Sequence, residues 1–204
     1  MVFLFLDIES FVDPEDTRSG LNPYHKNSKV IVIAYNFYAP PTAPAVAEIK
    51  PPTFLYEWEV GSEKALLQDF YQNLKKWASS QEFFKIVGFN HLAYDIPFLF
   101  SRMAHHKIAS DKELFDLLFS NTRHIDLAQI GMAVSKFTKR DEDFRNISQK
   151  AINYAYDIPV KEDTGVDVSR YYLEKRHDKI EKYCTEEFTF ELLYQSLLET
   201  FLHQ

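Results

Sequence analysis

The chain has 204 residues, of which 46% are hydrophobic and 16% aromatic, and it carries a formal net charge of −7 at pH 7. This hydrophobic share excludes a disordered chain, and the length suits one domain, which we expect to span residues 1–204. The negative charge argues against a protein that coats nucleic acids nonspecifically.

Cysteine content and hydropathy restrict the class of protein further. The single cysteine, Cys184, excludes an internal disulfide framework and a cysteine-rich zinc site. The sequence has no run near the roughly 20 apolar residues that a membrane span needs. The opening MVFLFL is too short for a signal peptide and has no basic leader. We therefore expect a cytoplasmic protein without membrane association.

Apolar runs near the start of the chain predict β-strands. Residues 2–7 are apolar on both faces, as in a central strand, and residues 29–38 are rich in β-branched and aromatic side chains. Residues 53–59 alternate well enough to predict a third strand. The proline-rich stretch 39–52 is expected to form a loop or an irregular sheet edge.

Helical spacing begins after this region. Ser62 is a favourable N-cap, and apolar residues then recur at helical spacing as far as Trp77. Residues 83–88 (FFKIVG) predict a short fourth strand. The segment IPFLFSRMAHH, with Pro97 in its first turn, predicts the next helix.

The second half of the chain predicts mostly helices. Residues 123–130 (RHIDLAQI) favour a short strand or turn that leads into a helix, and the pattern is mainly helical from Ile147 onward. The last part is expected to be one long amphipathic segment from about His177 to Phe201. Strands followed by alternating strands and helices predict an α/β fold, with helices packed on a mixed sheet.

The first apolar run ends in two carboxylates. In FLFLDIES, Asp7 and Glu9 are two residues apart, so on a strand they face the same side, roughly 7 Å apart. Buried like charges cost several kcal/mol unless they are paired or bound to a metal. This spacing raises the hypothesis of a divalent-cation site, which needs further carboxylates from other elements.

The next candidate lies in GFNHLAYDIPFLFSR, residues 88–102. Gly88 allows a sharp turn out of the strand, and Asn90 can lock a loop through side-chain hydrogen bonds. Asp95 comes just before the predicted helix. Taken alone, Asp95 is equally well interpreted as the N-cap of that helix.

The last candidate lies in KYCTEEFTFELL, residues 182–193. Tyr183 and Glu187 are four residues apart and share one helix face, whereas Glu186 points about 100° away. Taken alone, this pattern is typical of an ordinary amphipathic helix. Cys184 is expected to be buried packing rather than a ligand or a nucleophile.

Together, the ordered motifs resemble those of the DEDDy-type 3′–5′ exonucleases of the ribonuclease-H-like superfamily. They are similar in particular to the predicted exonuclease family related to the proofreading domain of family-B DNA polymerases. The resemblance runs through DIES, GFNHLAYDIPFLFSR, HIDL, ISQKAINYAYDIPVK and IEKYCTEEFTFELLY, and covers nearly the whole chain. It implies a ribonuclease-H-like mixed β-sheet flanked by α-helices.

The resemblance also implies an active site. Asp7, Glu9, Asp95 and Glu187 would hold two divalent ions, Mg²⁺ or Mn²⁺, and Tyr183 would orient the attacking water or help to deprotonate it. We expect Asp7 to bridge both ions, Glu9 and Glu187 to complete the water-activating site, and Asp95 to serve the second ion.

The implied substrate is a nucleic acid with a free 3′ end, and the implied reaction is two-metal phosphodiester hydrolysis. Ser10 and Asn90 are the implied substrate-binding residues. The likeness to polymerase proofreading domains favours single-stranded DNA over RNA and implies DNA repair or replication, with a protein partner that the sequence does not identify.

One residue departs from the family pattern. The family has aspartate where this chain has Glu187, and the extra methylene moves the carboxylate by on the order of 1 Å. Mg²⁺ demands near-ideal octahedral geometry, whereas Mn²⁺ tolerates such a change better. The alternative function is therefore a weakened or inactive exonuclease-fold module that binds nucleic acid.

Other sequence patterns are less informative about the site. His124 and Asp126 could reach the site, but a polar strand end satisfied locally explains them more simply. His177 lies outside the H-x-x-x-x-D pattern, which favours the tyrosine subtype over the histidine one. A phosphatase-type reading of DIE leaves GFNHLAYD and YCTEE unexplained, and no glycine-rich turn follows the first strand to support a Rossmann fold.

Overall fold

The computed structural model describes residues 2–13, 24–25, 27–38, 51–80, 84–137, 148–160 and 163–202. The strands are β1 (Val2–Phe11), β2 (Lys29–Tyr38), β3 (Thr53–Tyr56), β4 (Phe84–Gly88) and β5 (Arg123–Asp126). The helices are α1 (Glu57–Val60), α2 (Glu63–Ser80), α3 (Asp95–His105), α4 (Asp111–Phe115), α5 (Leu127–Phe137), α6 (Gln149–Ala155), α7 (Gly165–Leu173), α8 (His177–Glu187) and α9 (Phe190–Leu202), with a π-helical turn, η1, at Asp116–Ser120.

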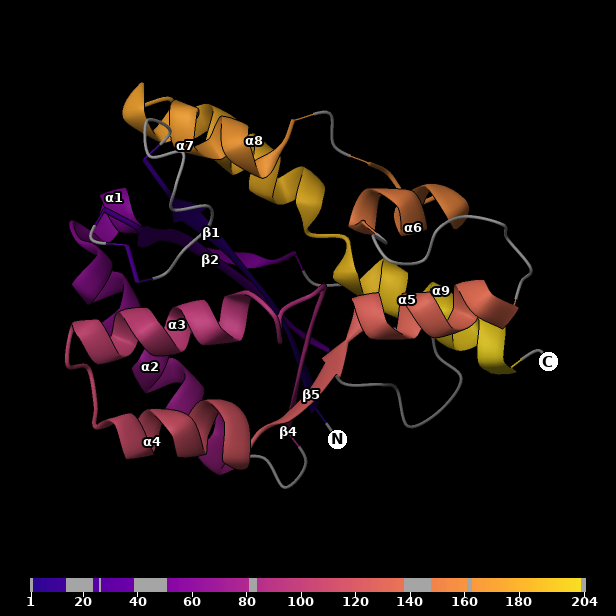
Figure 1. Cartoon of the computed structure of the whole chain (residues 1–204), viewed down its shortest axis with the longest axis horizontal. Coiled ribbons are helices and arrows are strands. Elements are labelled where there is room, and N and C mark those ends of the chain that lie inside the picture. The colour runs from indigo at the N-terminus through magenta and orange to yellow at the C-terminus, as the bar shows by residue number, and fades with distance from the viewer. Residues whose placement is uncertain are drawn as a thin grey trace.

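The strands form a five-stranded sheet in the order β3-β2-β1-β4-β5, with helices on both of its faces (Figure 1). β1 pairs antiparallel with β2 and parallel with β4, and β4 pairs parallel with β5. The mixed sheet flanked by helices confirms the fold class that the sequence predicts. No helix within the described ranges combines the length and the apolar character needed to span a bilayer.

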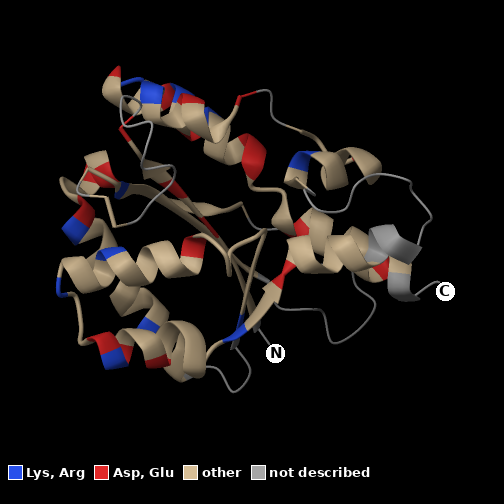
Figure 2. Ribbon diagram, in the orientation of Figure 1, with Lys and Arg blue, Asp and Glu red and all other residues tan. Residues whose placement is uncertain are grey.

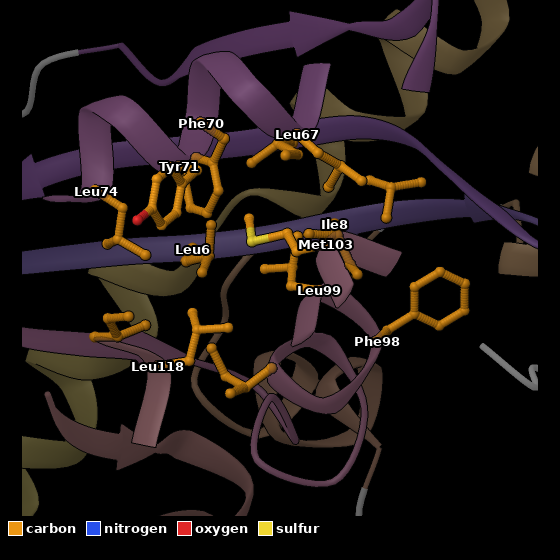
Figure 3. Close-up of a cluster of buried hydrophobic side chains, with 14 of the residues drawn as sticks. Leu6, Ile8, Leu67, Phe70, Tyr71, Leu74, Phe98, Leu99, Met103 and Leu118 are labelled. Atoms are coloured by element: carbon orange, nitrogen blue, oxygen red, sulfur yellow. The ribbon is translucent and has the colours of Figure 1, made fainter. Parts of the chain in front are cut away.

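β1 is the central strand, and its side chains alternate between two hydrophobic cores. Leu4, Leu6 and Ile8 face α2 and α3 in the first core (Figure 3). Phe3 and Phe5 face the opposite side, where α9 packs on the sheet. A period of two residues is what a strand buried on both faces requires. The same alternation continues beyond Phe5 and places the next odd-numbered residues on the side of α8 and α9.

The helix α2 begins where the sequence predicts. The hydroxyl Oγ of Ser62 accepts a hydrogen bond from the backbone N–H of Ala65 at 3.2 Å, as an N-cap does. The buried face of α2 consists of Leu66, Leu67, Phe70, Tyr71 and Leu74. Each such side chain contributes about 1.5–3 kcal/mol through burial, so α2 is held on the sheet chiefly by apolar packing.

Two sequence-based predictions are corrected by the structure. The third strand ends at Tyr56, and residues 57–60 form the single turn α1, which closes with a hydrogen bond from Gly61 N–H to Glu57 O at 2.9 Å. Gly61 has φ +88°, a left-handed conformation that glycine adopts without strain and that ends the turn. The long C-terminal segment breaks between α8 and α9, at residues 188–189.

The other predicted elements agree with the described structure. The strand first expected over residues 2–7 extends to Phe11, and residues 123–130 form β5 and the start of α5. Of the predicted loop, residues 39–50 lie outside the described residues, and residues 51–52 are irregular.

A buried charged group joins α2, α3 and β2. Glu63 Oε1 accepts hydrogen bonds from the backbone N–H of Val30 and from Arg102 Nε, both at 2.8 Å. Its Oε2 contacts a terminal nitrogen of Arg102 and His106 Nε2, both at 2.6 Å. Burial works to raise the pKa of Glu63, but the hydrogen bonds from Arg102, His106 and Val30 outweigh it and hold this pKa below its ordinary value of 4.5.

We predict that Glu63→Gln lowers the free energy of unfolding by about 3–5 kcal/mol at pH 7, because it leaves Arg102 buried without its carboxylate. A carboxylate whose pKa is lower in the folded state stabilises the fold above pH 4.5, and this stabilisation is lost as the pH falls through the folded-state pKa. The difference between the variant and the wild type should therefore shrink when denaturant unfolding is repeated near pH 3.5.

The matched control is Glu174→Gln. Glu174 pairs with Arg176 at 3.5 Å, but both side chains are exposed, so this variant should unfold like the wild type at both pH values. An equal effect of the two substitutions would contradict the assignment of Glu63 as a buried anchor.

Candidate metal centre

The centre of the site is the middle of β1. Asp7 and Glu9 continue the row of Phe3 and Phe5 on the face that α8 covers, and both lie inside the strand rather than after it. Glu9 is 8% exposed and Asp7 is partly buried. The pairing with β2 shifts between Glu9 and Ser10, so both acids precede the irregular part of the ladder. The hydrogen-bonded neighbours of β1 therefore fix the backbone that carries these two acids.

α8 supplies a third carboxylate. Ile180, Tyr183 and Cys184 are buried against β2 and α7, and this packing brings Glu187, the last residue of α8, over β1. One carboxylate oxygen from each of Asp7, Glu9 and Glu187 lies within 4.8 Å of the other two. The prediction that these three acids converge is in agreement with this geometry, and Cys184 is buried packing as expected.

Asp95 completes the arrangement from a different element. It lies in the first turn of α3, and its Oδ1 accepts a hydrogen bond from the backbone N–H of Ile8 at 3.0 Å. The N-cap position belongs to Tyr94, and no side chain caps the helix there. The interpretation of Asp95 as an ordinary N-cap is therefore wrong, because Tyr94 holds that position and the carboxylate of Asp95 accepts a hydrogen bond from β1.

The environment of Asp95 disfavours a negative charge. Burial is the main cause that raises the pKa of Asp95 to about 7, and the nearby charges of Glu187 and Asp126 raise it further, against the hydrogen bond from Ile8. A divalent cation between these oxygens would reverse this effect.

Tyr183 lies beside the acids and is 3% exposed. Burial, followed by the charges of Glu9 and Glu187, raises the pKa of Tyr183 above its ordinary value of 10, and its hydroxyl donates a hydrogen bond to Glu187. The phenol therefore keeps its proton near neutral pH. Its chemistry suits a hydrogen-bond donor that orients other groups better than a general base.

The loop between β4 and α3 is held by Asp126. The backbone N–H groups of Asn90, Leu92 and Ala128 donate to the carboxylate of Asp126 at 2.8, 3.3 and 3.0 Å. Asn90 has φ 56°, a left-handed conformation that asparagine tolerates, so its backbone shapes the loop. The carboxylate of Asp126 is thus satisfied by backbone N–H groups, one of them two residues away and two of them in the loop between β4 and α3.

A cavity of about 590 Å³ opens over the acids. Its described lining residues are Asp7, Ile8, Glu9, Phe89, Asn90, Tyr94, Asp95, Ala128, Met132, Ser148, Gln149, Tyr183 and Glu187. All five predicted catalytic residues and Asn90 are among them. Figure 2 shows acidic segments in the middle of β1, at the start of α3 and at the end of α8. The donor set is made of carboxylate oxygens, which are the ligands that Mg²⁺ and Mn²⁺ prefer.

Several lining residues are not predicted by the sequence patterns. Tyr94 directly precedes Asp95, and Gln149 is the first residue of α6, in the region where the sequence predicts helices. Their positions next to predicted helices are the only sequence signal that could have indicated them. Ser10 is 7% exposed and does not line the cavity; its Oγ lies 2.6 Å from the hydroxyl of Tyr94, which does. Direct contact between Ser10 and a substrate stays a prediction.

Comparisons with known proteins find matches among solved structures. No family model matches the chain, and no curated protein matches it. Among solved structures, the chain is similar to E. coli Exonuclease I, in a crystal structure of its complex with a dA16 oligonucleotide. The TM-score is 0.48 at 14% sequence identity, and the similarity covers 82% of this chain and 38% of that chain.

Proposed function

We propose that this chain is a divalent-metal-dependent 3′–5′ exonuclease that removes nucleotides from the 3′ end of single-stranded DNA. The observation that carries the proposal is the convergence of Asp7, Glu9 and Glu187 within 4.8 Å, in one cavity with Asp95. Acids crowded in this way, from three separate elements, suit a two-metal phosphodiesterase. The ordered exonuclease motifs in the sequence support the same reaction.

Each residue has a distinct part in this proposal. Bound Mg²⁺ or Mn²⁺ would lower the pKa of water and stabilise the negative charge that develops on the leaving 3′-oxygen. Asp7 and Glu9 would hold the ions from β1, Glu187 from α8 and Asp95 from α3. Tyr183 would orient the attacking water through its hydroxyl oxygen, because its raised pKa keeps the phenol protonated and disfavours a role as a general base.

The size of the cavity favours a chain end as the substrate. A volume of about 590 Å³ is in the range of sites that hold one small organic group. A terminal nucleotide is of the size that such a space holds, which supports a single-stranded or frayed 3′ end as the substrate. The preference for DNA, and a role in repair or replication, rest on the motif resemblance.

The first test is an assay of nucleotide release from a 3′-labelled single strand with Mg²⁺ and with Mn²⁺. We predict that Asp7→Asn lowers the rate by a factor on the order of 100 or more, because one lost ligand charge removes several kcal/mol of transition-state stabilisation. Glu187→Asp should retain or raise the rate, above all with Mg²⁺, because aspartate is the family residue.

The control for this assay is Asp111→Asn, which changes an exposed acid in the first turn of α4 and should leave the rate unchanged. Wild-type activity in Asp7→Asn would show that the cleavage comes from another site or a contaminant. Strand binding without nucleotide release by the wild type would favour the alternative, a nucleic-acid-binding module without activity.

A second prediction concerns stability. Mn²⁺ should raise the thermal unfolding midpoint of the wild type, because the ion binds only where the acids are gathered. At a concentration 100-fold above Kd the gain is about 2.7 kcal/mol for one site. Asp7→Asn should lose most of this gain in a thermal melt, and EDTA should return the wild type to its metal-free midpoint. An equal gain in both proteins would place the bound ion elsewhere.

A third prediction concerns Tyr183. Tyr183→Phe should lower kcat roughly 10-fold, which is less than the loss of about 10²–10⁴ expected on removing a general acid or base. The matched control is Tyr171→Phe on α7, whose hydroxyl donates to Asp163 at 3.2 Å and should not affect kcat. A loss well above 10³ in Tyr183→Phe would contradict the orienting role.

A further inference from the structure

The end of α8 is held in place by α6. α8 ends at Glu187, where the next helical N–H groups are missing, and carbonyls at such an end need other partners. The carbonyl oxygen of Glu187 accepts a hydrogen bond from Gln149 Nε2 at 2.9 Å and one from the backbone N–H of Thr189 at 2.7 Å. Gln149 Nε2 also lies 3.4 Å from Thr189 Oγ1. The junction between α8 and α9, at residues 187–189, is therefore held by hydrogen bonds from α6.

A second amide of α6 binds the same junction. Asn153 Nδ2 donates to Thr189 Oγ1 at 2.8 Å, and Asn153 is 3% exposed. Gln149 and Asn153 are four residues apart, so both amides leave the same face of α6.

α6 contacts α5 through a buried side chain. Ile152 is 5% exposed, and its Cδ1 occupies the space that a Cβ on Gly131 would fill. Only a glycine at 131 lets the two helices approach this closely. The position of Gln149 is thus set by a buried contact, and the amide can act as a fixed support.

Glu187 has special need of such a support. Its carboxylate must stay near Asp7 and Glu9, yet it leaves the last residue of a helix on a side chain with three rotatable bonds. Partners behind a metal ligand commonly change metal affinity by about 10-fold to 100-fold when they are removed.

We propose that Gln149 is a positioning residue for the metal centre: it fixes the end of α8 so that Glu187 presents its carboxylate to the ions. This inference rests on the proposed function. Gln149 also lines the cavity, so a direct contact with the nucleic acid strand is the competing role, and it has a different signature.

The test is a titration of metal-ion binding without substrate, in which free Mn²⁺ is measured by electron paramagnetic resonance. Gln149→Met keeps the length of the side chain but removes the donor, and it should weaken Mn²⁺ binding by about 10-fold or more. Gln149→Asn keeps the amide but is too short to reach Glu187, and it should weaken binding similarly. Circular dichroism and the metal-free melting midpoint show whether each variant is folded.

The matched control is Gln195→Met. Gln195 is a partly buried glutamine on α9 whose Nε2 lies 3.4 Å from Glu191 Oε1, and neither residue lines the cavity. This variant should bind Mn²⁺ like the wild type. In a Glu187→Ala background, Gln149→Met should cause no further loss, because its effect passes through the missing carboxylate.

Two outcomes would overturn the proposal. Wild-type Mn²⁺ affinity in folded Gln149→Met, with a raised KM for the strand, would assign Gln149 to substrate contact and leave the proposed function intact. Absence of Mn²⁺ binding by the wild type would remove the proposed function, and this inference with it.

Discussion

The structure depends on one electrostatic constraint, the crowding of carboxylates on one face of a buried strand. Asp7 and Glu9 repel each other and also repel Glu187, and burial makes each charge more costly. The backbone can hold them together only because β1 is bonded to strands on both sides and packed by apolar side chains on its other face. The stability of the α2 and α3 layer thus supports an arrangement that is unfavourable by itself.

Local patterns in the sequence were enough to predict most of these parts. The alternation of β1 predicts that Asp7 and Glu9 share a face, and the spacing of Tyr183 and Glu187 predicts a shared helix face. Both periodicities follow from backbone geometry and need no knowledge of distant contacts. The sheet with its flanking helices could be predicted for the same reason.

Features that depend on distant contacts could not be predicted. The break after Glu187 is stabilised by the amide of Gln149, which lies 38 residues earlier in the chain. The carboxylate of Asp95 accepts a hydrogen bond from the backbone of Ile8, 87 residues earlier in the chain, and the loop before Asp95 is held by Asp126. In each case a polar side chain forms a hydrogen bond with a group that is distant in the sequence and is brought near only by the tertiary structure.

The histidine pair His91 and His124, at the loop between β4 and α3, has a defined protonation state. His124 Nε2 lies 2.8 Å from the carbonyl of Leu118, so this nitrogen carries the proton, and Nδ1 accepts from His91 Nε2 at 3.1 Å. Burial lowers the pKa of His91 to about 4, so this histidine is neutral at physiological pH. A neutral pair adds no charge to a region that already holds many acids.

The alternation of side chains along β1 also restricts insertions and deletions within this strand. A single-residue insertion or deletion between Phe3 and Asp7 would exchange the two faces of the strand. Asp7 and Glu9 would then face the hydrophobic core under α2, while Leu6 and Ile8 would face the cavity. A conservative apolar substitution at Leu4 or Leu6 would therefore disturb the site less than a change in the number of residues between Phe3 and Asp7.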